Sequence, residues 1–189
     1  MNSNHVNHKL RLHPPRFMIS CRAQGGHYRT FNSWANDLVC FLHISPKISY
    51  LQIGGNDLSS TSSDIVPNEV YSFASFLHYG MQIPIVVIGQ LLWRDPSSTN
   101  QNYDDNVKEV NAKLLHIIRQ DNNSCIIFWR HHGIWSDLSF LGRDGVHINY
   151  NGMFRYMRSV RNAVLHASNV LGKVWYYWYT CVFGWYTTY

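Results

Sequence analysis

Short apolar runs alternate along this chain with longer stretches whose apolar residues recur at helical spacing. The runs are Phe17–Cys21, Ile48–Ile53, Ile83–Ile88 and Ser124–Trp129. The helical stretches lie around residues 31–42, 67–77, 107–118 and 153–167. Strands that are apolar on both faces and alternate with helices are typical of a parallel sheet covered by helices on both sides. The sequence therefore predicts an α/β fold with three layers, α/β/α, and a mostly parallel sheet.

The composition narrows the function classes. A chain of 189 residues that is 46% apolar and 14% charged can bury a core and is neither a disordered tail nor a coiled coil. The net charge is +5, but basic residues are scattered, which does not favour a nucleic-acid partner. The four cysteines form no C-x-x-C pair. No apolar signal segment begins the sequence, so we expect an intracellular protein.

The eleven histidines do not predict a metal site. His131 and His132 are adjacent and have no third ligand at a suitable spacing, so we expect them at a substrate rim or bonded to their own loop. We expect no metal and no cofactor.

In a parallel α/β sheet, ligands bind beyond the carboxyl ends of the strands. Gly54-Gly55-Asn56-Asp57 follows one strand, and it forms either a tight turn or a donor for a developing negative charge through the Asn56 amide. Asp144 precedes His147 by three residues in the loop before the last helix. That pair is either a turn with a helix cap or a base oriented by a carboxylate. Trp93-Arg94-Asp95 follows another strand and either shapes a groove or packs with an ion pair.

In this order, these segments resemble the SGNH (GDSL-type) hydrolase superfamily over residues 4–168. The chain is similar in particular to divergent copies in animal mobile-element-associated proteins. The resemblance implies a flavodoxin-like sheet, with His147 as general base and Asp144 as its orienting carboxylate. It also implies a set of oxyanion or substrate-binding residues, namely Asn56, Gly54 and the backbone N–H of Gly25 or Gly26.

The family's first block, a G-D-S sequence that follows the first strand and holds the nucleophile, is absent here. In register it would fall at residues 2–4, which puts Asn4 at the serine position. A shift of one residue makes Ser3 the candidate, although no strand precedes it. We therefore expect the first strand to be missing, with its two neighbours drawn together or a fold that does not hold.

These features predict a truncated domain of the ester or acyl-ester hydrolase type that is weakly active or inactive. If the domain is active, its substrate is a small ester or acylated compound. Whether the chain is an enzyme stays open, as does its oligomeric state. The alternative is a non-catalytic binding module of a mobile-element-derived protein, associated with nucleic acid.

The last part of the chain differs in composition from the rest. Nine aromatic residues lie within residues 174–189. The predicted organisation is a remnant of the N-terminal block at 1–16, the hydrolase-like domain at 17–168 and a tail at 169–189 outside the fold. The tail is too short to span a membrane, which takes about 20 apolar residues. Two alternatives to a tail outside the fold stay open. One is an interfacial or anchoring role at a membrane, and the other is packing over the gap left by the first strand.

Overall fold

The computed structural model describes residues 17–20, 46–99, 102–171 and 180–184. Four of its five strands and its three longer helices lie at positions that the apolar pattern predicts. The strands are β1 (Phe17–Ser20), β2 (Ile48–Gln52), β3 (Ile85–Gly89), β4 (Ile126–Trp129) and β5 (Thr180–Gly184). The helices are α3 (Ile65–Ser75), α4 (Tyr103–Asp121) and α5 (Tyr150–Val170), with short turns η1 (Asp57–Ser59), η2 (Phe76–Gly80) and η3 (Leu138–Phe140).

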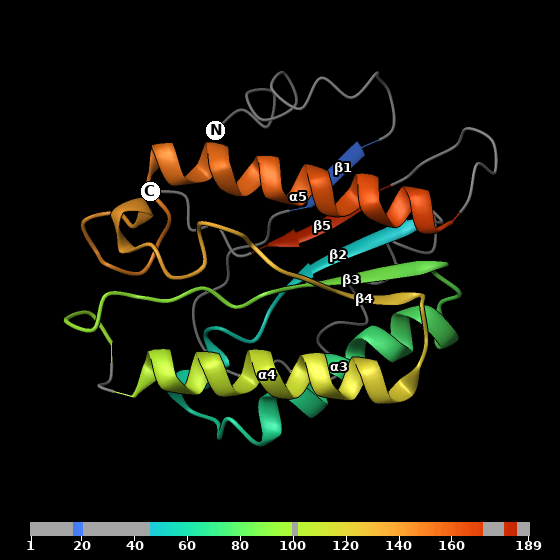
Figure 1. Ribbon diagram of the computed structural model, residues 1–189, viewed down its shortest axis with the longest axis horizontal. Coiled ribbons are helices and arrows are strands. Elements are labelled where there is room, and N and C mark those ends of the chain that lie inside the picture. Colours follow the sequence, from blue (N-terminus) through green and yellow to red (C-terminus); the bar gives the residue numbers. More distant parts are fainter. Residues whose placement is uncertain (1–16, 21–45, 100–101, 172–179, 185–189) are drawn as a thin grey trace.

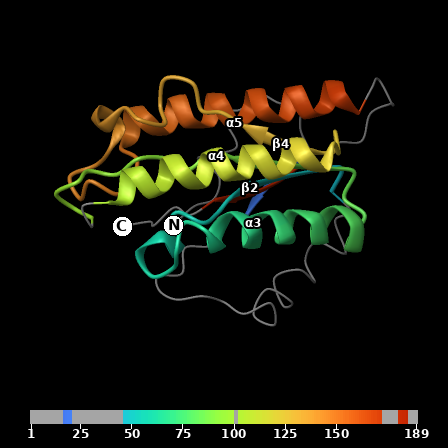
Figure 2. The same cartoon turned by 60° about the horizontal axis from the view of Figure 1, so that its bottom comes forward.

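The strands form one five-stranded sheet in the order β1-β5-β2-β3-β4, and every pair of neighbours is parallel. Helix α5 covers one face, while α3 and α4 cover the other (Figure 1). The view in Figure 2 shows the same separation of α5 from α3. The three-layer α/β/α fold predicted from the sequence is confirmed.

The centre of the sheet differs from the expectation. β5 lies between β1 and β2, and Thr180 is in register with Phe17 on one side and with Ile48 on the other. A flavodoxin-like sheet places its first strand at this position, between the second and the third. The predicted gap is therefore filled, and residues 180–184 belong to the sheet rather than to a tail outside it.

A strand fills this position because the backbone groups of β1 and β2 need hydrogen-bond partners. An empty central position would leave two rows of N–H and C=O groups without ladder partners in the interior of the protein. Residues 180–184 read Thr-Cys-Val-Phe-Gly, and β-branched and aromatic residues favour strands. The predicted N-terminal remnant, residues 1–16, and the predicted helix around 31–42 lie outside the described residues.

Two separate cores hold the layers together. Leu51, Val86 and Ile88 are buried against α3 and α4. Tyr50 and Val87 belong to the opposite core, which packs against α5. Since neighbouring strand residues point to opposite faces, β2 and β3 contribute alternately to both. This packing fixes the carboxyl ends of these strands, where the candidate site lies. No helix in the described ranges has the length and apolar character needed to cross a bilayer.

Candidate functional site

The dyad predicted from the Asp-x-x-His spacing is formed. His147 Nδ1 lies 2.5 Å from Asp144 Oδ2. The other carboxylate oxygen accepts the backbone N–H groups of Val146 and His147, both at 3.0 Å. The turn and the imidazole oriented by a carboxylate, which the sequence left as alternatives, thus occur together, and the N-cap of α5 is Asn149 rather than His147. With Nδ1–H donating to the carboxylate, Nε2 is the nitrogen able to accept a proton.

The dyad is neither buried nor fully exposed. The relative side-chain exposures are 39% for His147 and 29% for Asp144, so a substrate can reach the imidazole. The loop is held at both ends. Gly142 N donates to His147 O at 2.6 Å, and Asn149 Nδ2 donates to Leu141 O at 2.9 Å. Asn149 also caps α5 by accepting from Gly152 N. The imidazole therefore projects from a loop tied to a helix start.

Asn56 lies at the start of η1, after the turn that ends β2. Gly54 has a φ of +100°, and a Cβ there would lie 3.2 Å from both Val66 and Val70, so the turn requires glycine. Gly54 is thus a buried turn residue beneath the exposed Asn56. The sequence predicts Gly54 as a binding residue, and that role stays a prediction.

Arg94, from the loop after β3, contacts Asn56. Its guanidinium donates to Asn56 Oδ1 and lies 4.6 Å from the ring centroid of Tyr103. The Tyr103 hydroxyl donates in turn to Gly55 O at 3.1 Å. Because a guanidinium only donates, the amide oxygen of Asn56 faces it and the amide Nδ2 lies on the other side. The orientation of the predicted oxyanion donor is therefore set by Arg94.

The same loop also reaches the dyad. Asp95 N donates to Gly145 O at 2.7 Å. Gly145 has a φ of +66°, and a Cβ there would lie 2.3 Å from Ser98 Oγ and 2.5 Å from Asp95 Cβ. The loops after β2, β3 and β4 thus form a chain of contacts from Asn56 to Asp144. The sequence places Arg94 after its strand but does not indicate its partner, Asn56.

A buried polar network lies at the ends of the same strands. His131 is fully buried, with Nε2 at 2.8 Å from the Tyr50 hydroxyl and Nδ1 at 2.9 Å from Ser159 Oγ. Its backbone N donates to Gln90 Oε1, and Gln52 Nε2 donates to Gln90 O, each at 3.0 Å. The network ties β2, β3 and the residues after β4 to α5. Of the two positions expected from the sequence, the substrate rim is wrong for the buried His131, whereas its backbone O does accept from Ile134 N and Trp135 N of its own loop.

The directions of these bonds indicate one tautomer. Trp129 Nε1 donates to Ser159 Oγ at 3.0 Å, and the Tyr50 hydroxyl donates to Gln52 Oε1 at 2.9 Å. Ser159 can then donate to His131 Nδ1, while His131 Nε2–H donates to Tyr50. Burial lowers the pKa of His131 to about 4, with His132 adding to the effect. His131 is therefore neutral at physiological pH.

Other predicted site residues lie outside the described residues, namely Ser3, Gly25 and Gly26. Within the described ranges, no hydroxyl hydrogen-bonds His147 Nε2 in the way a nucleophile would. In the same ranges, no three histidine, cysteine, aspartate or glutamate side chains gather where a metal ion could be held.

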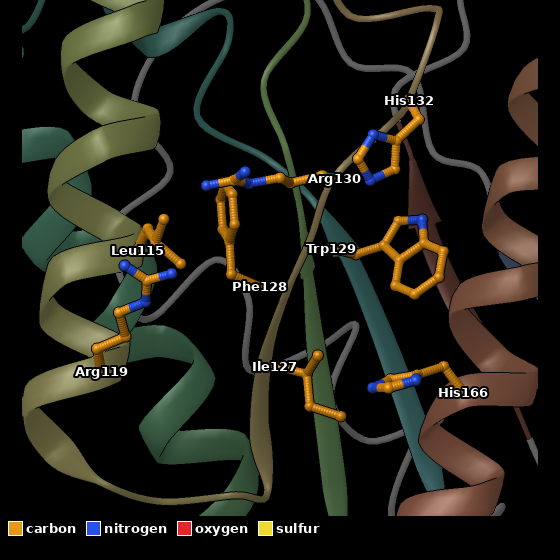
Figure 3. A pocket seen from close by; sticks show the side chains of 8 residues that line it. All are labelled: Leu115, Arg119, Ile127, Phe128, Trp129, Arg130, His132 and His166. Atoms are coloured by element: carbon orange, nitrogen blue, oxygen red, sulfur yellow. The ribbon is translucent and has the colours of Figure 1, made fainter.

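A separate groove of about 300 Å³ lies at the edge of the sheet formed by β4. Its lining residues are Leu115, Arg119, Ile127, Phe128, Trp129, Arg130, His132 and His166. Figure 3 shows Arg119 and Arg130 on the Phe128 side and both histidines on the Trp129 side. The groove thus reaches round the edge strand and contains no acidic side chain.

Comparison with known proteins identifies the fold. No family model and no curated protein matches the sequence. An acetyl esterase structure with bound acetate matches at 15% identity and a TM-score of 0.58, over 69% of this chain and 63% of that chain. A carbohydrate esterase of family 3 from Talaromyces cellulolyticus matches at 14% identity and a TM-score of 0.57, over 68% and 62%. A GDSL-like lipase from Bacteroides thetaiotaomicron matches at 16% identity and a TM-score of 0.57, over 70% and 69%.

The matches cover less than two thirds of the acetyl esterase and carbohydrate esterase chains. At these identities the likeness concerns the fold. The chain therefore shares the α/β/α fold of these esterase and GDSL-like lipase structures.

Proposed function

We propose that this chain is an ester-hydrolase-type domain in which the Asp144–His147 dyad supplies the general base and Asn56 an oxyanion donor. The observation that supports it best is the 2.5 Å contact between His147 Nδ1 and Asp144 Oδ2, on a half-exposed loop at the carboxyl end of the sheet. In the reaction, His147 Nε2 takes a proton from the attacking hydroxyl and returns it to the leaving alcohol. Asp144 stabilises the imidazolium formed between these steps.

The nucleophile determines how fast this chemistry runs. In the family register Asn4 takes the serine position and Ser3 lies one residue away, and no described hydroxyl hydrogen-bonds His147 Nε2. We propose that the 189-residue chain uses water activated by His147 and hydrolyses small esters slowly. A triad that lacks one member keeps only a small part of its rate enhancement, roughly 10³–10⁴-fold over water in a well-studied case.

The test is hydrolysis of 4-nitrophenyl acetate by the purified chain. His147→Ala and Asp144→Asn should each lower the rate, because one removes the base and the other its orienting charge. Histidines hydrolyse activated esters without any site, so His116→Ala, an exposed position on α4, provides the matched control. A wild-type rate equal to that of His147→Ala would contradict the proposal.

A second assay asks whether a serine takes part. A fluorophosphonate probe forms a covalent bond to an activated serine with loss of fluoride, and peptide mass mapping locates the adduct. We expect no adduct that depends on His147. An adduct on Ser3 that disappears in His147→Ala would establish a complete serine triad and refute slow catalysis through water.

The groove at β4 supports a second candidate function, a non-catalytic module that binds a single-stranded nucleic acid. Arg119 and Arg130 have no ion-pair partner among the residues described, and Phe128 and Trp129 offer aromatic rings beside them. Cationic side chains next to aromatic rings suit a phosphate backbone and stacked bases. We expect a labelled oligonucleotide to bind with a steep salt dependence that Arg119→Gln weakens. Equal binding by Arg119→Gln and wild type would remove this candidate.

A further inference from the structure

We propose that Arg94 forms an anion-binding subsite beside Asn56, so that the ester accepted by the site bears a carboxylate or phosphate group. The inference rests on the function proposed above and adds the chemical class of the substrate.

The charge of Arg94 has no ion-pair partner within the described part of the chain. Its guanidinium donates to the neutral amide oxygen of Asn56. The carboxylates of Asp104 and Asp95 bind other groups. The Asp104 carboxylate accepts from the backbone N of Arg94 at 3.1 Å, and the Asp95 carboxylate accepts from the N and Oγ of Ser97 at 2.8 and 2.6 Å. A cation that has no carboxylate partner favours an anionic ligand.

The guanidinium is also held in place before any ligand arrives. It stacks over Tyr103, a buried residue whose hydroxyl is bound to Gly55 O. The backbone N–H groups around it are bound as well, Trp93 N to Trp135 O at 2.8 Å and Asp95 N to Gly145 O at 2.7 Å. A fixed, planar donor loses little freedom on binding and suits two-point contact with a carboxylate or phosphate.

The position of the subsite links it to the reaction. Arg94 touches Asn56, the candidate oxyanion donor, while the next residue, Asp95, bonds to Gly145 in the dyad loop. An anion held by the remaining guanidinium N–H groups therefore lies at the same end of the sheet as His147. A substrate anchored there by its charge would present its ester between Asn56 and the dyad.

The test measures binding rather than turnover. Monomethyl succinate, which has one ester and one carboxylate, is compared with neutral dimethyl succinate by NMR titration of the full chain. We expect the monoester to bind at least about tenfold more tightly, because hydrogen bonds to a charged partner are roughly twice as strong as neutral ones. Arg94→Gln should remove this preference and Arg94→Lys should keep part of it. Arg158→Gln, an exposed arginine on α5, should keep all of it.

Competition between inorganic phosphate and monomethyl succinate distinguishes phosphate from carboxylate. The anion that displaces the other at the lower concentration belongs to the preferred class. Equal binding of both succinate esters by the wild type, or an unchanged preference in Arg94→Gln, would overturn the subsite. A preference for the monoester without His147-dependent hydrolysis supports the subsite and contradicts the proposed function. Hydrolysis through His147 without any preference contradicts the subsite alone.

Discussion

Replacement of Asn111 by leucine tests how the loop that bears Arg94 is held. Asn111 lies on α4 and is 6% exposed. Its Oδ1 accepts from Leu91 N at 2.8 Å and its Nδ2 donates to Leu91 O at 3.0 Å. One side chain thus satisfies both backbone groups of a buried residue just after β3. Leucine has nearly the same shape but neither donates nor accepts.

The magnitude follows from the two groups left behind. Each buried backbone group without a partner costs about 1–3 kcal/mol, so Asn111→Leu loses roughly 2–6 kcal/mol before any gain. The new apolar side chain returns about 1.5 kcal/mol on burial, which leaves a net loss of about 0.5–4.5 kcal/mol. At a urea slope of about 2 kcal/mol/M, a loss of 3 kcal/mol lowers the midpoint by about 1.5 M.

The assay is urea unfolding followed by circular dichroism. Asn162→Leu, an exposed asparagine on α5, is the matched control and should change the free energy of unfolding by less than about 0.5 kcal/mol. If Asn111→Leu unfolds at the wild-type midpoint with the same slope, the Leu91 groups have other partners. The claim that α4 holds this loop would then be refuted.

Three further predictions concern stability. Burial lowers the pKa of His131 from 6.5 to about 4, so only the unfolded chain takes up this proton as the pH falls from about 6.5 to 4. The uptake should lower the free energy of unfolding by up to about 3 kcal/mol. The urea midpoint should therefore fall over this pH range in the wild type and fall less in His131→Gln. Gly145→Ala forces a side chain to a φ of +66° and against Ser98, which should cost about 1–3 kcal/mol and lower any His147-dependent hydrolysis. A chain ending at Leu171 lacks β5 and should lose cooperative unfolding in circular dichroism, whereas one ending at Gly184 should keep it.

The local parts of the fold could be predicted because local patterns determine them. Strand and helix positions follow from apolar periodicity, as the match between the predicted run Ile48–Ile53 and β2 illustrates. The dyad was predictable because Asp144 and His147 are three residues apart, and a turn joins them without help from the rest of the chain.

The contacts that complete the site span long separations, and no local pattern reports them. Asn56 and Arg94 are 38 residues apart, and Tyr50 and His131 are 81 apart. The polarity of His131 suggested a rim position or a bond to its own loop, but a set of polar partners around it allows complete burial. β5 was missed for a related reason. Its hydrogen-bond partners are β1 and β2, which lie far away in the sequence.

The position of β5 separates two roles that one segment has in the SGNH pattern. In that pattern, the first strand both fills the centre of the sheet and leads into the serine block. In this chain a C-terminal strand fills the centre and runs parallel to both neighbours, as a first strand would. The backbone of the sheet can therefore be satisfied without the segment that supplies the nucleophile. Stability and the proposed catalysis should then respond to different changes. Loss of β5 should unfold the chain, while His147→Ala should leave its unfolding midpoint nearly unchanged and remove only the hydrolysis proposed for the dyad.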